Sequence, residues 1–203
     1  MMKNKMIDEQ IKEKSKRLFF SCGIRSISMD DVARECGISK KSIYQYFDDK
    51  NALLCAIVDE VVQSHKQLLK TCRLTSKDAI DEVIKQSGEP FEIWANIRPV
   101  FFYELEKSFP KAWHALNLYR SNMRDGIIRN LEWGKQEALY RADVNSTFTA
   151  EVWLHQVINF LQRRFVTTQK WCVHQSVTEF TKLHLHSITS EKGKQKIQTY
   201  FSQ

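Results

Sequence analysis

The sequence contains few residues that interrupt helices. Of its 203 residues, only three are proline and six are glycine. No segment shows the alternation of Val, Ile and Thr with polar residues that is typical of strands. The long stretches between the helix breakers therefore predict an all-α protein.

Paired cysteines are also missing. The five cysteines are odd in number and widely spaced, and none forms a C-x-x-C pair. This pattern argues against a disulfide framework and indicates small apolar side chains in a reducing compartment.

Long hydrophobic runs are absent as well. The longest uninterrupted apolar run, Ala52 to Val58, is seven residues long. The charged first fourteen residues contain no apolar segment of the kind found in a secretory signal. We therefore expect a cytoplasmic protein with no membrane partner.

Acidic residues are in the minority. The formal net charge is +7 and the isoelectric point is about 9.1. The first fifty residues carry eleven Lys or Arg against eight Asp or Glu, an excess of only three. This mild bias is compatible with a polyanionic partner but does not amount to a basic tail.

Hydrophobic periodicity, caps and breakers delimit the expected helices. These cover residues 7–22, 29–36, 40–47, 50–73, 76–87, 91–108, 110–140, 147–165, 172–188 and 192–201.

The second and third of these helices predict a helix-turn-helix over residues 28–47. Ser28 stands where a helix N-cap is needed, and Ser39 does the same for the next helix. Between them, Gly37 can take the turn. Ala33 allows the two helices to approach closely, and Ile43 can fill the wedge between them.

The third helix presents two different faces. Ile38, Ile43 and Phe47 can fix it to the domain, while hydroxyl, amide and lysine side chains face the other way. A helix that enters the major groove of DNA needs short polar or basic side chains in its first turns. Because Lys and Ser are common on any surface, an ordinary solvated face is the alternative interpretation.

From Ile11 to Leu54, the order of helix, Gly23, SMDDVA, GISK, SIYQYF and Lys50 resembles the N-terminal domain of TetR family transcriptional regulators. The resemblance implies a three-helix DNA-binding domain at residues 5–65. It also implies a helical ligand-binding and dimerisation domain at residues 76–203. The implied function is that of a dimeric repressor, which binds palindromic double-stranded DNA and is released by a small-molecule effector.

The resemblance also suggests which residues contact DNA. Hydroxyls, helix-start amides, Tyr44 and Lys50 would bind phosphates, and the others would lie nearest the base edges. The predicted set is Ser28, Ser39, Lys40, Lys41, Ser42, Tyr44, Gln45, Tyr46 and Lys50. Lys41 and Asp48 depart from the family pattern, and the role of Lys41 stays open.

Aromatic residues gather in the central helices, where the resemblance implies a ligand. Buried aromatic side chains with a few polar neighbours are typical of ligand pockets, although ordinary core packing explains the same pattern. The candidates for ligand contact are Trp94, Arg98, Phe101, Phe102, Trp113, Tyr119, Asn122 and Met123.

The segment around Val157 has an apolar arc of about 160° at 3.6 residues per turn, wider than one core-facing stripe requires. Two buried faces are therefore expected, one of them against a second subunit. The candidates for a homodimer interface are Trp153, Val157, Phe160, Leu161, Val177, Phe180 and His184.

Catalytic and metal sites find little support. No Ser-His-Asp order, phosphate-binding glycine loop or paired carboxylate motif is present. His184 and His186 lie two residues apart on a helix and cannot easily share an ion. We predict no catalytic residue, metal or cofactor. A DNA-binding regulator without an effector and, less favoured, an enzyme that uses the aromatic region remain the alternatives.

Overall fold

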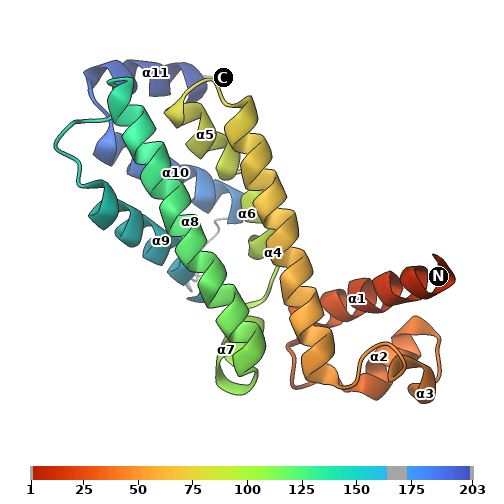
Figure 1. Cartoon of the computed structure of the whole chain (residues 1–203). Helices are drawn as coiled ribbons and strands as arrows, with labels where there is room; N and C mark the ends of the chain where they lie inside the picture. Colours follow the sequence, from red (N-terminus) through yellow and green to blue (C-terminus); the bar gives the residue numbers. More distant parts are fainter. Residues whose placement is uncertain (1, 164–172, 202–203) are drawn as a thin grey trace. The chain divides into compact units, whose positions relative to one another are not determined.

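The computed structural model describes residues 2–163 and 173–201. Within these ranges the regular secondary structure is helical, apart from one isolated β-bridge (Figure 1). The all-α prediction is confirmed. The helices are α1 (Met2–Cys22), α2 (Met29–Cys36), α3 (Lys40–Ile43), α4 (Lys50–Thr75), α5 (Ala79–Gln86), α6 (Glu89–Ala95), α7 (Pro99–Ser108), α8 (Pro110–Gln136), α9 (Ser146–Arg163), α10 (Val173–Ile188) and α11 (Glu191–Phe201).

The chain divides into two compact units. The first contains Met1–Ser64 and Asn96–Tyr119, and the second contains His65–Ala95 and Arg120–Gln203. Residues 96–119, which the sequence analysis assigned to the C-terminal domain, thus pack with the N-terminal helices. Among the described helices, none is long and apolar enough to cross a membrane.

The first unit is built around apolar side chains from α1, α2, α3 and α4. Ile11, Phe19, Val32, Ile43 and Leu53 are all fully buried. Each comes from the apolar face of its helix, and this shared core stabilises α2 and α3, which are too short to be stable alone.

The second unit has its own apolar core, contributed by α5, α8, α9, α10 and α11. One set of buried polar groups within it is paired through Asn130. Asn130 donates to the carbonyl of Ala79 at 3.0 Å and to Glu82 at 2.8 Å, and it accepts from the hydroxyl of Tyr140 at 3.1 Å. These bonds satisfy polar atoms that would otherwise cost free energy on burial.

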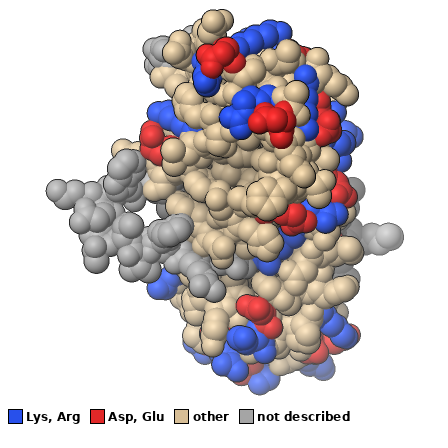
Figure 2. Space-filling model, turned by 90° about the vertical axis from the view of Figure 1, so that its left-hand side faces the viewer, with Lys and Arg blue, Asp and Glu red and all other residues tan. Residues whose placement is uncertain are grey.

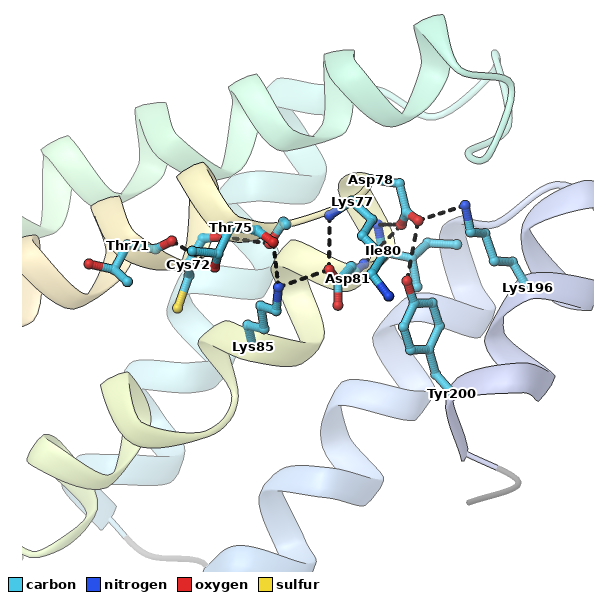
Figure 3. A network of polar contacts seen from close by, with 11 residues as sticks. Thr71, Cys72, Thr75, Lys77, Asp78, Ile80, Asp81, Lys85, Lys196 and Tyr200 are labelled. Atoms are coloured by element: carbon cyan, nitrogen blue, oxygen red, sulfur yellow. Dashed lines mark hydrogen bonds and ion pairs between the residues drawn. The ribbon is translucent and has the colours of Figure 1, made fainter.

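The start of α5 is joined to α11 by a polar network (Figure 3). Asp78 caps α5 by accepting from the N–H groups of Ile80 and Asp81 at 2.9 Å. Lys196 lies 2.6 Å from the same carboxylate, and the Tyr200 hydroxyl donates to it at 3.3 Å. Burial alone would raise the pKa of Asp78, but Lys196 and the two N–H groups hold it below its ordinary value.

Several predicted helix boundaries were wrong. The expected helix over residues 91–108 is divided into α6 and α7, because Pro99 starts a new helix. The helix expected from residue 76 begins at Ala79 instead, where Asp78 is the N-cap of α5. The expected helix over residues 110–140 ends at Gln136, where Ala138 takes a positive φ of 56°. The predicted ends at residues 165 and 172 lie outside the described residues.

Two glycines of α8 are expected to respond oppositely to alanine. A Cβ at Gly134 would lie 2.1 Å from the Tyr140 ring, whereas a Cβ at Gly126 would meet its nearest atom, in the Arg129 side chain, at 3.5 Å. We expect Gly134→Ala to lower the free energy of unfolding by about 1–3 kcal/mol. Gly126→Ala should raise it by up to about 1 kcal/mol through helix propensity. Urea denaturation checks both, and equal effects would contradict the packing at Gly134.

Candidate nucleic-acid interface

The start of α2 is fixed by a reciprocal cap. The Ser28 hydroxyl accepts from the N–H of Asp31 at 3.1 Å, and the Asp31 carboxylate accepts from the N–H of Ser28 at 2.9 Å. The hydrogen bonds from the Ser28 side chain and backbone lower the pKa of Asp31. Two backbone donors at the helix start are satisfied in this way, so the position of α2 is well defined.

The turn between α2 and α3 depends on Gly37. Its φ of 69° lies in the left-handed region, which a residue with a side chain rarely adopts. The N–H groups of Gly37 and Ile38 donate to the carbonyls of Arg34 and Ala33 at 3.1 and 3.0 Å. The chain therefore leaves α2 sharply and starts α3 at Lys40, after three intervening residues, which confirms the predicted turn.

Ser39 caps α3, as predicted. Its hydroxyl accepts from the N–H of Ser42 at 3.0 Å, and the two serine hydroxyls are 2.8 Å apart. The helix itself is shorter than expected, because after Ile43 the chain continues in turns to Phe47. Ile43 is fully buried and Phe47 is 6% exposed, so these two side chains attach α3 to the first unit.

The opposite side of α3 faces solvent. Ser39, Lys40, Lys41 and Gln45 are exposed, and Tyr44 is 42% exposed. Lys40 lies 2.9 Å from Asp30 at the start of α2, and this hydrogen bond raises the pKa of Lys40. The side chain of Lys41 makes no hydrogen bond or ion pair with any described residue, which leaves its charge available to a partner. The other predicted residues of the helix, Ser42 and Tyr46, are half-buried.

Lys50, which was predicted to bind a phosphate, makes contacts within the protein. Its ammonium group donates to the carbonyls of Ile24 and Ile27 and lies over the Phe19 ring. Burial lowers the pKa of Lys50, while the carboxylates of Glu104 and Asp31 act in the opposite direction. Lys50 therefore binds the protein's own backbone. An ammonium group that already donates to two carbonyls is less available to bind a phosphate.

The eight candidate ligand residues are divided between the two units. Trp94, Asn122 and Met123 belong to the second unit, and the other five belong to the first. Phe101, Phe102 and Tyr119 are buried, and Asn122 is exposed. Arg98 has a structural contact instead, because its guanidinium donates to the carbonyl of Ser21 at 2.7 Å.

The candidate dimer residues lie mainly on the neighbouring faces of α9 and α10. Trp153 stacks on Phe180 and on His184, with ring centroids 4.6 and 3.9 Å apart. Phe160 lies 6.3 Å from Phe180. Val177 differs, because at 5% exposed it is buried within its own unit and cannot contribute surface to a partner.

A groove of about 420 Å³ lies beside this stack, lined by residues that include Val144, Phe148, Trp153, Phe180 and His184. Phe148 is 67% exposed, and Leu183, which also lines the groove, is 70% exposed. The face of the molecule that carries α9 has a central area with few charged side chains (Figure 2). Apolar side chains exposed together in this way are typical of interaction surfaces.

Two short helices joined by a glycine turn, with a buried anchor and an exposed polar face, define a helix-turn-helix protein. Residues 11–57 match the family model of the bacterial regulatory proteins of the tetR family. The N-terminal segment of the chain therefore carries a helix-turn-helix domain of the tetR type.

Curated relatives match over a limited part of the chain. The uncharacterized HTH-type transcriptional regulator YerO of Bacillus subtilis is 33% identical over 86 residues, which are 41% of this chain and 30% of the relative. The HTH-type transcriptional regulator TtgR of Pseudomonas putida is 29% identical over 72 residues, or 36% and 33% of the two chains. The chain therefore spans about a third of the length of these relatives.

Solved structures share the fold over nearly the whole chain. A TetR family transcriptional regulator from Agrobacterium tumefaciens has a TM-score of 0.76 at 17% identity, covering 92% of this chain and 99% of that one. The ketosteroid transcriptional regulator KstR2 of Mycobacterium tuberculosis has a TM-score of 0.67 at 13% identity, covering 91% and 95%. The combination of an N-terminal helix-turn-helix with a helical C-terminal part is confirmed.

The contacts of Lys50 predict a role in stability that Lys41 lacks. We expect Lys50→Met to lower the free energy of unfolding by about 1–3 kcal/mol, because two carbonyls lose a charged donor. Lys41→Met makes the same charge change on an exposed side chain and should alter it by less than about 0.5 kcal/mol. Guanidinium denaturation measures both values, and a Lys50→Met protein as stable as Lys41→Met would rule out the contact.

Proposed function

We propose that this protein is a DNA-binding transcriptional regulator that reads duplex DNA with α3. The observation that carries the proposal is the geometry of α3, whose polar face is exposed while Ile43 and Phe47 bury the opposite side. Lys41, Tyr44 and Gln45 offer a charge, a hydroxyl and an amide on the exposed side. These groups suit phosphates and base edges in the major groove.

The regulator acts as a homodimer through the α9 and α10 face. The exposed apolar side chains Phe148 and Leu183 border the stack of Trp153, Phe180 and His184. A second copy of the same face would remove this apolar surface from water around a twofold axis. Two copies of α3, spaced about 34–36 Å apart, would then read the half-sites of a palindrome.

The regulation proposed is repression that a small molecule relieves. The aromatic residues Trp94, Phe101, Phe102, Trp113 and Tyr119, with Asn122 and Met123, remain the candidates for effector contact. An effector can weaken DNA binding only to the extent that it binds one dimer geometry more tightly than the other. Arg98 is left out of this set, because its guanidinium already binds the end of α1.

Selection of bound duplexes from random DNA tests the central proposal, and the salt dependence of binding identifies the phosphate contacts. We expect a palindromic sequence to be enriched. Lys41→Ala should lower the slope of log affinity against log salt by about one unit, whereas Lys50→Met should leave the slope unchanged. Random sequences recovered without enrichment would contradict sequence-specific binding. Small molecules are then screened for release of the selected duplex, and the absence of any release favours the regulator without an effector.

The dimer interface is tested with two leucines of similar exposure. Leu183 on α10 is 70% exposed and lines the groove, whereas Leu74 on α4 is 75% exposed and does not. We expect Leu183→Glu to give a monomer, because a charge in an apolar interface must be desolvated. Leu74→Glu should remain a dimer in the same sedimentation velocity experiment. A wild-type monomer at all concentrations, or a dimeric Leu183→Glu protein, would exclude this interface.

A further inference from the structure

The loop over residues 23–28, which connects α1 to α2, is bound from two sides within the first unit. On one side, a single Glu104 oxygen from α7 accepts from the N–H groups of Ile24 and Arg25 at 2.5 and 2.9 Å. On the other side, Lys50 at the start of α4 donates to the carbonyls of Ile24 and Ile27. Ile24 is thus held through both its N–H and its carbonyl, and its side chain is fully buried.

The approach of α7 to this loop requires a glycine. Gly23 has a φ of 88°, and a Cβ at this position would lie 3.0 Å from the bound Glu104 oxygen and 3.3 Å from Val100. The positive φ would therefore strain a residue with a side chain, and an added Cβ would press on Glu104 and Val100. The close fit places the Glu104 carboxylate directly over the turn that follows α1.

Arg98, at the start of α7, binds the end of α1. Its N–H donates to the carbonyl of Phe20 at 3.0 Å, and its guanidinium donates to the carbonyl of Ser21 at 2.7 Å. The Phe20 ring also packs edge-on against Phe101 of α7, with centroids 4.9 Å apart. These contacts place a cation at the negative end of the α1 dipole and fix α7 against the last turn of α1.

The loop determines where the helix-turn-helix begins. Ser28, its last residue, is the N-cap of α2, and Lys50 belongs to the first turn of α4. A shift of Ile24 and Ile27 would therefore move both the start of α2 and the Lys50 contact. Glu104 lies far along the chain from α3. Its carboxylate nevertheless binds the loop that leads directly into α2, the first helix of the helix-turn-helix.

We propose that Glu104 is a positioning residue for DNA recognition, which holds the loop so that α2 is placed correctly and α3 can enter the groove. This inference rests on the proposed function. It assigns to Glu104 a part in binding DNA although its carboxylate need not touch DNA. The contact also provides a physical route by which a change in α7 would alter the affinity for DNA.

The test compares Glu104→Gln with Glu106→Gln, using the duplex that the wild-type protein selects. Both changes remove one negative charge from α7, and Glu106 is exposed without a hydrogen bond or ion pair to any described residue. Charge alone would make each variant bind DNA slightly more tightly. Loss of positioning should instead weaken the affinity of Glu104→Gln for the selected duplex at least about fivefold, with little change for random duplex.

Hydrogen exchange of the free proteins gives a readout that does not depend on DNA. We expect faster exchange over residues 23–28 in Glu104→Gln, and exchange at the wild-type rate in Glu106→Gln. Equal affinities of the two variants for the selected duplex would overturn the inference while leaving the proposed function intact. A wild-type protein that selects no duplex would overturn both. Should Glu104→Gln unfold, the test uses Glu104→Asp, which retains the carboxylate. We expect Glu104→Asp to lose part of the affinity for the selected duplex. Wild-type affinity in this variant would overturn the inference.

Discussion

The exposed polar side of α3, which we propose reads DNA, depends on how α3 is attached to the first unit. A helix of four residues has almost no stability of its own, because the cost of nucleation is not recovered over one turn. Its position comes from Ile43, which is fully buried, and from Phe47, which is nearly so. Gly37 reverses the chain before it and the Ser39 hydroxyl accepts from the N–H of Ser42, so the same few residues decide which side chains face outward.

Much of this arrangement could be predicted from the sequence, because it depends on local chemistry. A serine before two acids predicts a helix start, and a glycine before another serine predicts a turn followed by a new helix. The ends of α5 and α8 were less predictable. The cap of α5 is also stabilised by Lys196 and Tyr200, more than one hundred residues away, and α8 ends where the chain turns back to pack Tyr140.

The contacts of Lys50 and Glu104 could not be predicted from the sequence either, because they join residues that are distant along the chain. In the sequence, a lysine at the start of a helix next to a polar segment suggests a phosphate contact. A glutamate among aromatic residues suggests a ligand contact. Only the folded chain brings both side chains to the same loop, where one binds carbonyls and the other binds N–H groups. Such long-range pairings leave no trace in periodicity or composition, whereas the exposed pattern of α3 does.

In the proposed function α3 is the surface that meets DNA, and the backbone amide NMR spectrum of the protein with and without the selected duplex tests this contact. Addition of the duplex should shift the amide resonances of residues 39–46 and the start of α2 most strongly. Smaller shifts are expected over residues 23–28, and no direct effect on α5 or α11. Resonances of residues 39–46 that stay unchanged while those of another surface shift would contradict the account.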